Sequence, residues 1–514
     1  MTQETNINPG EVSFKDFLFK DKQNKTILKY SAFIIIIQFG VFKYFYPYAS
    51  YIHGDSFSYL YAAFDNLDIN TYLVGYSKFL RLFSVFSNID LALVAFQYFY
   101  IQCSALIFMF TLSYFNNFNK VIRFLFLTLI ICNPLFLYLG NLVSSDCLFV
   151  ALSLNWFSSL IWLINRPQNK IIAAHTVVLF IAFTFRYNAL IYPIISIVTF
   201  GLSKLSFKNK LIGIIACLMP CSSFIAYTMY HYKKLTGQLQ YSPFGGWQLA
   251  NNAMYAYRYI DSAARKPVPT KFQALDNMVR EYFDSTRDLK KYPHESLMAS
   301  TVYMWDSTLP LFRYRDKLFI NKHQVSELKK WASMGPFYKE YGLTIIKQYP
   351  IQFINYFIWP NANKYFAPPV EFLQYYNSGK DSVPLIAETW FRYNSKKIHP
   401  RLNNLRVYIL DLYPIFSGII NVVFLCCLIS FIWLKGYWRK DINKNEIILA
   451  STIWLINAAF TITASSAALR FQTFPILITS SFTLLLIDSI IKHANEGHSV
   501  SQKIVNNSLL VDGK

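Results

Sequence analysis

Long apolar segments constrain this chain more than any other feature of its sequence. A helix needs about 20 mostly apolar residues to cross the hydrocarbon core of a bilayer. Ten segments reach or approach that length: 27–48, 91–115, 120–139, 146–164, 170–185, 187–203, 209–230, 406–434, 447–466 and 470–491. They predict an all-α polytopic membrane protein with about ten transmembrane helices. The fifth and sixth segments are short and meet at Arg186, so the count depends on whether they cross separately.

The composition excludes several other classes of protein. Only 15% of the 514 residues are charged and the mean hydropathy is +0.27, whereas soluble domains carry about 25% charged residues. A soluble enzyme, a disordered chain and a disulfide-dense secreted domain are therefore not expected. The seven cysteines lie in or beside apolar segments without CxxC or Cys/His spacing. We therefore expect no disulfide framework, no zinc site and no cofactor, and leave a divalent metal open.

The net charge of +21 bears on topology and partners. In a membrane protein an excess of cations lies in cytoplasmic loops and against lipid headgroups. We expect no nucleic-acid partner, because no basic and aromatic module of the usual kinds is present. Most cations in short loops lie on the side of the N-terminus, which predicts cytoplasmic termini. No cysteine falls in the large outer loop, which suits a bacterial inner membrane.

These observations divide the chain into five parts. We predict a cytoplasmic N-terminus, a membrane module with a first outer loop, a mostly helical periplasmic domain, C-terminal transmembrane helices and a cytoplasmic tail: residues 1–26, 27–230 with loop 49–90, 231–405, 406–491 and 492–514. Within the periplasmic domain, residues 272–291 and 323–348 have helical periodicity.

Four charged residues lie in or beside predicted spans, all on the outer side. Charges at such positions are costly in a membrane and are candidates for function. Asp55 follows the first span and Asp146 begins the fourth. Arg186 lies between the fifth and sixth spans, and Arg470 opens the last. Two carboxylates and two arginines at one mouth of a bundle indicate a polar cavity.

Each of these residues also has a simpler interpretation. Asp55 and Asp146 precede helical patterns, where aspartate commonly caps the first turn. Arg186 and Arg470 stand where arginine side chains snorkel to the membrane interface. The sequence leaves both sets of alternatives open.

Five short motifs resemble those of the GT-C superfamily of integral-membrane glycosyltransferases, which includes the protein mannosyltransferases and the aminoarabinose transferases. They are "GDSFSYLYAA", "VGYSKFLRLF", "SSDCLFVAL", "FRYNALIYP" and "LRFQTFP", in that order along the chain. Together they extend over most of the membrane part. The first motif lacks an adjacent second acidic residue, which argues against the double-acidic metal site of oligosaccharyltransferases.

The resemblance implies a GT-C-like bundle that moves a sugar from a polyprenyl-phosphate donor to an acceptor on the outer side of the membrane. The acceptor would be a protein, a glycolipid or a cell-wall polymer. An attacking hydroxyl must lose a proton and the leaving phosphate needs positive charge. The candidate general base is Asp55. The candidate contacts to the donor phosphate are Arg186, Arg470, Lys78 and Arg81. Four more residues are candidates to orient these side chains or to contact the acceptor: His53, Tyr59, Asp146 and Asn188.

Several candidate residues, and the protein as a whole, also have other interpretations. Lys78 and Arg81 share a helix face and also fit solvent or lipid headgroups, and His53 also fits a plain surface histidine. The tryptophans of the periplasmic domain suggest sugar stacking, or alternatively a hydrophobic core: Trp247, Trp305 and Trp331. At the level of the whole protein, the alternatives are a flippase or transporter for a lipid-linked sugar, and a non-catalytic subunit of a membrane complex.

Overall fold

The computed structural model describes residues 12–292, 295, 299–321, 324–402, 404–439 and 443–511, with side chains described up to residue 495. In these ranges the chain is helical, and β-structure is limited to isolated bridges such as the one between Ser50 and Leu142. The prediction of an all-α fold is confirmed.

Eight helices in the described part of the chain are long and apolar enough to cross a membrane. They are α2 (Lys22–Phe45), α5 (Asp90–Phe115), the pair α6 (Lys120–Ile131) and α7 (Pro134–Gly140) counted as one, α8 (Asp146–Asn165), α11 (Phe207–Thr236), α20 (Tyr413–Trp433), α21 (Lys444–Ala464) and the apolar part of α22 (Leu469–Val511). The chain is therefore a helical membrane protein. The fifth and sixth predicted spans form shorter apolar helices, α9 (Asn169–Phe185) and, after the 3₁₀ turn Tyr187–Ile191, α10 (Tyr192–Leu202).

Proline and asparagine decide where several of these helices break. Between α6 and α7 the Asn133 side chain accepts a hydrogen bond from the Leu135 N–H, and Pro134 takes the first helical position, where its missing N–H costs nothing. Pro220 instead lies within α11, which continues past it to Gly237, whose φ of +77° ends the helix. Helices in a membrane tolerate an internal proline because neighbouring groups satisfy the freed carbonyl.

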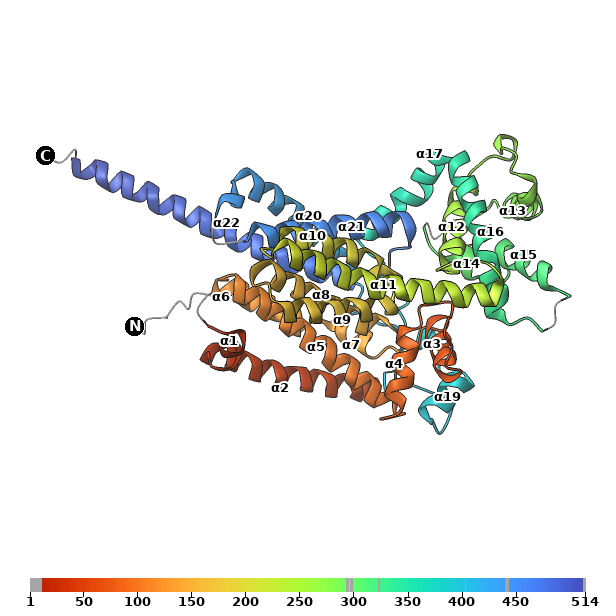
Figure 1. Ribbon diagram of the computed structural model, residues 1–514, viewed down its shortest axis with the longest axis horizontal. Coiled ribbons are helices and arrows are strands. Elements are labelled where there is room, and N and C mark those ends of the chain that lie inside the picture. Colours follow the sequence, from red (N-terminus) through yellow and green to blue (C-terminus); the bar gives the residue numbers. More distant parts are fainter. Residues whose placement is uncertain are drawn as a thin grey trace.

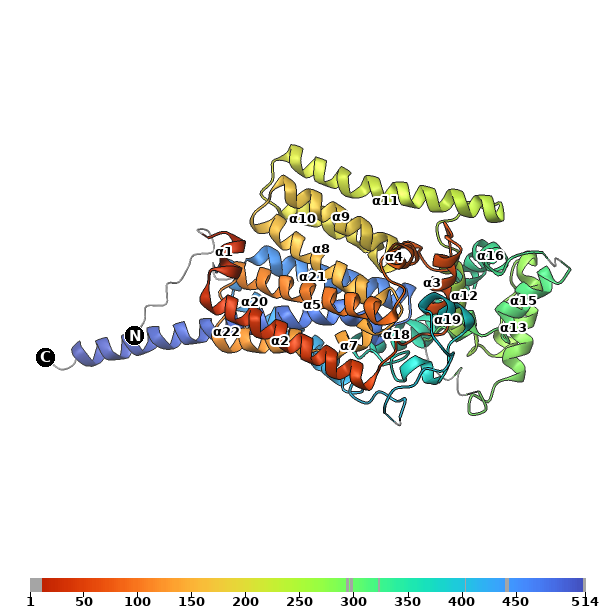
Figure 2. The ribbon, with the colours of Figure 1, turned by 90° about the horizontal axis from the view of Figure 1, so that it is seen from below.

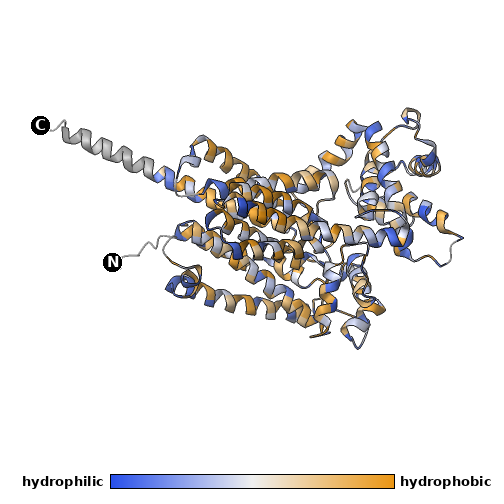
Figure 3. Cartoon of the chain, viewed as in Figure 1, coloured by the Kyte–Doolittle hydropathy of each residue, from blue (hydrophilic) through white to orange (hydrophobic). Residues whose placement is uncertain are grey.

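The membrane helices surround α8, which is buried along nearly its whole length, and α2 lies at the outside of the bundle. On α2 the apolar side chains of Phe33 and Ile36 are 62% and 60% exposed. Exposed apolar surface of this kind is suited to lipid. Figure 3 shows the apolar bundle helices and, to one side, a more polar region.

That polar region is a second helical cluster with its own core. It comprises α12 (Pro243–Tyr257), α13 (Gln273–Ser285), α14 (Val302–Trp305), α15 (Pro310–Phe319), α16 (Glu327–Gln348), α17 (Pro350–Phe353) and the π-helix Ile354–Ile358. The next helix, α18 (Trp359–Phe366), packs against α20 and α21 of the bundle. Helices α12 and α16 touch backbone to backbone, because a Cβ on Gly246 would stand 1.9 Å from the carbonyl oxygen of Gly335. The two periodic segments expected in this region correspond to α13 and α16, although α13 is shorter than expected.

Three short helices lie at the same end of the bundle as this cluster: α3 (Asp55–Phe64), α4 (Gly75–Ser84) and α19 (Leu385–Phe391). Figures 1 and 2 place α1 (Phe14–Phe19) and the C-terminal part of α22 at the opposite end. We call these the α3 end and the α1 end of the bundle. On α4 one face is buried while Leu82 is 63% exposed, as in a helix lying along a membrane interface.

Candidate functional site

Asp55, Asp146, Arg186 and Arg470 converge at the α3 end and form what we call the charge cluster. Arg470 Nη1 lies 2.6 Å from Asp55 Oδ2 and 3.1 Å from Asp146 Oδ2, and Arg186 Nη1 contacts the other oxygen of Asp146. Asp55 and Arg470 are 415 residues apart in the chain. Carboxylates and guanidinium groups therefore alternate through a single network.

Helix termini bring these four residues together. Asp55 and Asp146 are the first residues of α3 and α8, Arg470 is the second residue of α22, and Arg186 ends α9. The N-cap positions of α3 and α8 belong to Gly54 and Ser145, and neither helix has a side-chain cap hydrogen bond. The capping interpretation of the two aspartates thus does not describe their contacts, although each favours its helix through the dipole.

Burial separates the cluster into an inner and an outer pair. The side chains of Asp146 and Arg470 are 1% and 4% exposed, whereas those of Asp55 and Arg186 are each 15% exposed. Arg470 therefore does not snorkel to the interface: two carboxylates compensate its charge inside the protein. The outer pair, Asp55 and Arg186, is the part that a bound molecule can reach.

Hydroxyl groups complete the hydrogen bonding of the two carboxylates. The Tyr72 hydroxyl donates to Asp55 Oδ1 at 2.6 Å, and the Ser144 hydroxyl donates to Asp146 Oδ2 at 2.6 Å. Burial and the neighbouring Asp55 charge raise the pKa of Tyr72 well above its usual value, so this phenol remains a donor. Both oxygens of Asp55 are thus occupied, one by Tyr72 and one by Arg470.

Aromatic rings cover the guanidinium groups. The Phe471 ring centroid lies 4.3 Å from the Arg470 guanidinium carbon and 4.7 Å from that of Arg186, and the Phe372 centroid lies 4.4 Å from Arg470. Phe372 has a left-handed backbone with φ of +59°, which costs a residue with a Cβ about 1–2 kcal/mol. These contacts add cation–π attraction and exclude water from the ion pairs.

A loop after α18 carries Phe372 and is fixed to the start of α22. The Leu469 N–H donates to the Pro369 carbonyl at 2.9 Å. The fully buried Asn361 accepts from the Ala467 N–H at 3.1 Å and donates to the carbonyl of Ser465 at 2.6 Å. The stretch before α22 is therefore held firmly, and Arg470 with it.

Four further residues belong to the site and were not predicted from the sequence: Tyr72, Ser144, Phe372 and Phe471. Phe471 and Ser144 stand inside quoted motifs, next to residues that were selected for their charge. Tyr72 and Phe372 carry no local signal, because loops far apart in the chain bring them to Asp55 and Arg470.

Two predicted phosphate contacts lie elsewhere. Lys78 donates to Asn66 Oδ1 at 2.9 Å and faces Asp68 at 3.6 Å. Arg81 donates to the carbonyls of Ala63 and Phe64 at 3.1 and 3.2 Å. The bonds of Arg81 satisfy carbonyls at the C-terminal end of α3. Asp55 lies at the other end of this helix, about 14 Å from Phe64 at 1.5 Å per residue. The structure does not bring either cation to the charge cluster.

The remaining predicted residues surround the cluster at different distances. The Tyr59 hydroxyl lies 3.0 Å from the Ser145 hydroxyl, which is itself 3.4 Å from Arg186 Nη1. Asn188 is half-buried in the 3₁₀ turn after Arg186. His53 packs edge-on against Phe57 with ring centroids 5.0 Å apart. Partial burial and the positive charge of Lys380 lower the pKa of His53.

One of the three candidate tryptophans stands beside this site. Trp305 is 39% exposed, and its ring centroid lies 6.1 Å from that of Tyr72, the residue that binds Asp55. Trp247 and Trp331 stack at 5.6 Å and are 0% and 4% exposed, so they belong to the core of the second helical cluster. Of the three, only Trp305 is exposed beside the charge cluster.

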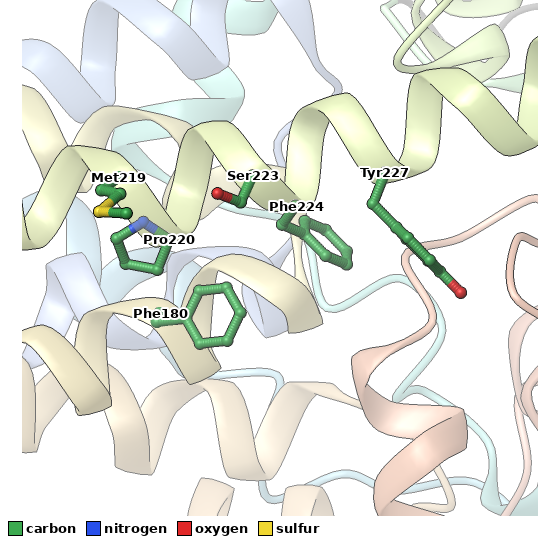
Figure 4. A pocket seen from close by; sticks show the side chains of 6 residues that line it. All are labelled: Phe180, Met219, Pro220, Ser223, Phe224 and Tyr227. Atoms are coloured by element: carbon green, nitrogen blue, oxygen red, sulfur yellow. The ribbon is translucent and has the colours of Figure 1, made fainter.

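An apolar hollow of about 570 Å³ lies between α9 and α11. Figure 4 shows its lining side chains: Phe180, Met219, Pro220, Ser223, Phe224 and Tyr227. Phe224 also lines a neighbouring cavity of about 10 Å³, whose other walls include Tyr72 and Tyr187. That second cavity holds no more than about one water, so side chains close the route from the hollow to Tyr72.

In the described part of the chain, no group of three or more His, Cys, Asp and Glu side chains is arranged to hold a metal ion. The two carboxylates of the charge cluster are paired with arginine instead. Comparisons with family models, with curated proteins and with solved structures found no match for this chain.

Proposed function

We propose that this chain is a membrane glycosyltransferase of the GT-C type, which transfers a sugar from a polyprenyl-phosphate donor to an acceptor at the α3 end of the bundle. The observation that carries the proposal is the outer pair of the charge cluster: a reachable carboxylate, Asp55, beside a reachable arginine, Arg186. Both lie at the α3 end of the bundle, Asp55 at the start of α3 and Arg186 at the end of α9. The motifs that resemble the GT-C superfamily contain both residues and support the same function.

Asp55 acts as the general base in this proposal. An acceptor hydroxyl loses its proton as it attacks the anomeric carbon, and a carboxylate at hydrogen-bonding distance accepts that proton. The Asp55 oxygen bound by Tyr72 is the one that exchanges this bond for the acceptor hydroxyl, because the other oxygen remains paired with Arg470. Arg470 holds the carboxylate in position.

Arg186 binds the leaving phosphate. One of its terminal nitrogens contacts Asp146, and a guanidinium group has five N–H donors, so donors remain for a phosphate. Arg470 is less suited to this role, because it is buried and two carboxylates already compensate its charge. The proposal thus gives the two arginines different tasks.

The donor's polyprenyl chain occupies the apolar hollow between α9 and α11 (Figure 4). Its lining is apolar except for Ser223 and the hydroxyl of Tyr227. The neighbouring narrow cavity leads to Tyr187, next to Arg186 in the chain, and to Tyr72. Entry of the donor moves these two aromatic side chains aside, and Trp305 then stacks on a sugar.

In this proposal α9 and α10 also cross the membrane, which gives ten spans. The α3 end faces the outside of a bacterial inner membrane, and the second helical cluster is a periplasmic domain that holds the acceptor. Helix α1 and the last part of α22 lie at the same end of the bundle (Figure 1). This placement agrees with an even number of membrane crossings.

The test compares the glycans on envelope proteins and lipids from cells with the native chain, a deletion, Asp55→Asn or Asp65→Asn. Asp65 is a matched control, because it is an exposed carboxylate at the other end of α3. We expect one sugar to disappear in the deletion and in Asp55→Asn, with the Asp55→Asn protein still present in the membrane, and to remain in Asp65→Asn. Loss of the sugar in the deletion alone would assign the chain to a transporter or a non-catalytic subunit.

A further inference from the structure

A cavity of about 530 Å³ lies apart from the charge cluster, between the turn that joins α4 to α5 and the segment that follows α19. Its lining includes Tyr48, Phe86, Asn88, Asp90, Arg392 and Lys397. We call it the α5–α19 cavity. None of the four residues of the charge cluster lines it, and its size is in the range of small-molecule sites.

The cavity has a surplus of positive charge. Arg392 and Lys397 are exposed, and neither forms an ion pair with another described residue. The one carboxylate in the lining, Asp90, is 8% exposed, and its Oδ2 atom accepts from the Ala49 N–H at 2.8 Å and from the Tyr393 hydroxyl at 2.9 Å. Asp90 also begins α5, where the helix dipole favours a negative charge. Its charge is therefore compensated, and the two cations are free to meet an anion.

Two further features of the lining point to a ligand. The Asn88 Oδ1 atom is buried and has no hydrogen-bond partner, although buried acceptors are rarely left unpaired. Arg392 ends α19 with φ of +54° and ψ of +45°, a left-handed conformation that glycine adopts without strain. The Tyr393 N–H fixes this turn by donating to the Glu388 carbonyl at 3.0 Å. Arginine therefore occupies a backbone conformation that glycine would adopt with less strain.

The cavity lies where two of the membrane helices end. The last residue of α2 and the first of α5, Phe45 and Asp90, mark the ends of two membrane helices. The segment after α19 is tied to the end of α2, because the Arg401 N–H donates to the Phe45 carbonyl at 2.8 Å. At the rim, Phe86 and Ile89 are 80% and 61% exposed. Apolar side chains at a span end face acyl chains, and cations there face phosphates.

We propose that the α5–α19 cavity binds the headgroup of an anionic phospholipid, independently of the proposed transfer reaction. Arg392 and Lys397 contact the phosphate, for which an arginine fork and a lysine point charge are both suited. When the Asn88 side chain turns toward the cavity, its unpartnered oxygen accepts a hydrogen bond from a headgroup hydroxyl. The acyl chains lie against Phe86 and Ile89. Phosphatidylglycerol has the phosphate and the hydroxyls that this arrangement takes.

The experiment titrates the full-length chain, purified in detergent, with phosphatidylglycerol, and counts bound lipid by native mass spectrometry. Phosphatidylcholine and free glycerol phosphate are titrated in parallel. The double variant Arg392→Gln/Lys397→Gln removes the two cations of the cavity, and Lys317→Gln/Lys329→Gln removes two exposed cations of the second helical cluster as a control of equal charge. A third variant, Phe86→Ser, tests the apolar rim.

We expect phosphatidylglycerol to bind the native chain and the control variant equally. Loss of both cations of the cavity should weaken binding by roughly tenfold or more, as for charge-assisted bonds to phosphate. Phe86→Ser should weaken the binding of phosphatidylglycerol and leave the binding of glycerol phosphate unchanged. Equal binding of phosphatidylcholine, or unchanged binding in the double variant, would overturn the proposal. Binding of glycerol phosphate as tight as that of the lipid would also overturn it, because the ligand would then be a soluble phosphate.

Discussion

Two clusters, one at each end of the bundle, bury acidic side chains and compensate their charge in opposite ways. At the α3 end the charge cluster pairs Asp55 and Asp146 with two arginines. At the α1 end, Glu446 of α21 is 0% exposed, and amide groups surround it: Asn116 Nδ2 lies 2.9 Å from Oε2 and Asn165 Nδ2 lies 2.6 Å from Oε1.

The amide cluster has the geometry of a structural clamp. Asn116 follows α5 and Asn165 ends α8, so Glu446 ties the ends of three membrane helices together. Asn443 caps α21 and donates to Asn165 Oδ1 at 2.8 Å. Every contact in this cluster is internal to the protein. The charge cluster differs in having an outer pair, Asp55 and Arg186, that a ligand can reach.

Removing the central cation of the charge cluster should have the largest effect. In Arg470→Gln, Asp55 and Asp146 lose their shared partner while Asp146 remains buried, and breaking a buried pair in this way costs about 3–5 kcal/mol. We expect a lower unfolding temperature and less folded protein in detergent. Arg470→Lys should recover part of this loss. Unchanged unfolding of Arg470→Gln would mean that the buried ion pairs do not hold the α3 end together.

Arg186→Gln should separate binding from folding. Asp146 keeps its bond to Arg470 in this variant, so its charge stays compensated and we expect a smaller loss of stability than in Arg470→Gln. Transfer activity should fall by about tenfold to a hundredfold, through a higher KM for the lipid-linked donor. The measurement is the initial rate of transfer by the purified chain at several donor concentrations, which gives kcat and KM separately. A lower kcat with an unchanged KM would place Arg186 in the chemical step instead.

Glu446→Gln tests whether the clamp at the α1 end needs a charge. Glutamine keeps the shape and one acceptor oxygen, so we expect a change of about 1 kcal/mol or less in the free energy of unfolding. Glu446→Ala leaves the two asparagine amides without their acceptor and should cost about 1–3 kcal/mol. Thermal unfolding of both variants in detergent distinguishes the contributions. A large loss in Glu446→Gln would show that the carboxylate itself is required.

The membrane helices and the charge cluster could be predicted from the sequence, whereas the amide cluster could not. The apolar segments predicted the membrane helices, because the length and hydropathy of a span are local properties. The four charged residues were selected because each stands alone at the end of an apolar segment. Glu446 was not selected, because it follows three polar residues at the start of a span. In the sequence these four residues resemble an ordinary polar loop. Its burial depends on asparagines 281 and 330 residues away.

Long-range geometry explains the other differences. Lys78 and Arg81 lie on α4, the helix after α3, and their contacts to Asn66, Ala63 and Phe64 place them at the end of α3 away from Asp55. The stretch from Trp359 to Asn377 contains three prolines, and its first eight residues nevertheless form α18. Proline at the first helical positions favours a helix start as readily as a turn, so its presence alone did not decide between the two.

The smallest effect should come from His53, which adds a dependence on pH to the α3 end. Burial and Lys380 lower its pKa in the folded chain, whereas in the unfolded chain the pKa stays near the usual value of about 6.5. The unfolded state therefore takes up the proton first as the pH falls below that value, and stability decreases with it until the folded pKa is passed. His53→Gln should remove this decrease and leave stability above pH 7 unchanged. The unfolding temperatures of both proteins between pH 7.5 and 5 measure the difference, and parallel curves would show that His53 is solvated as in the unfolded chain.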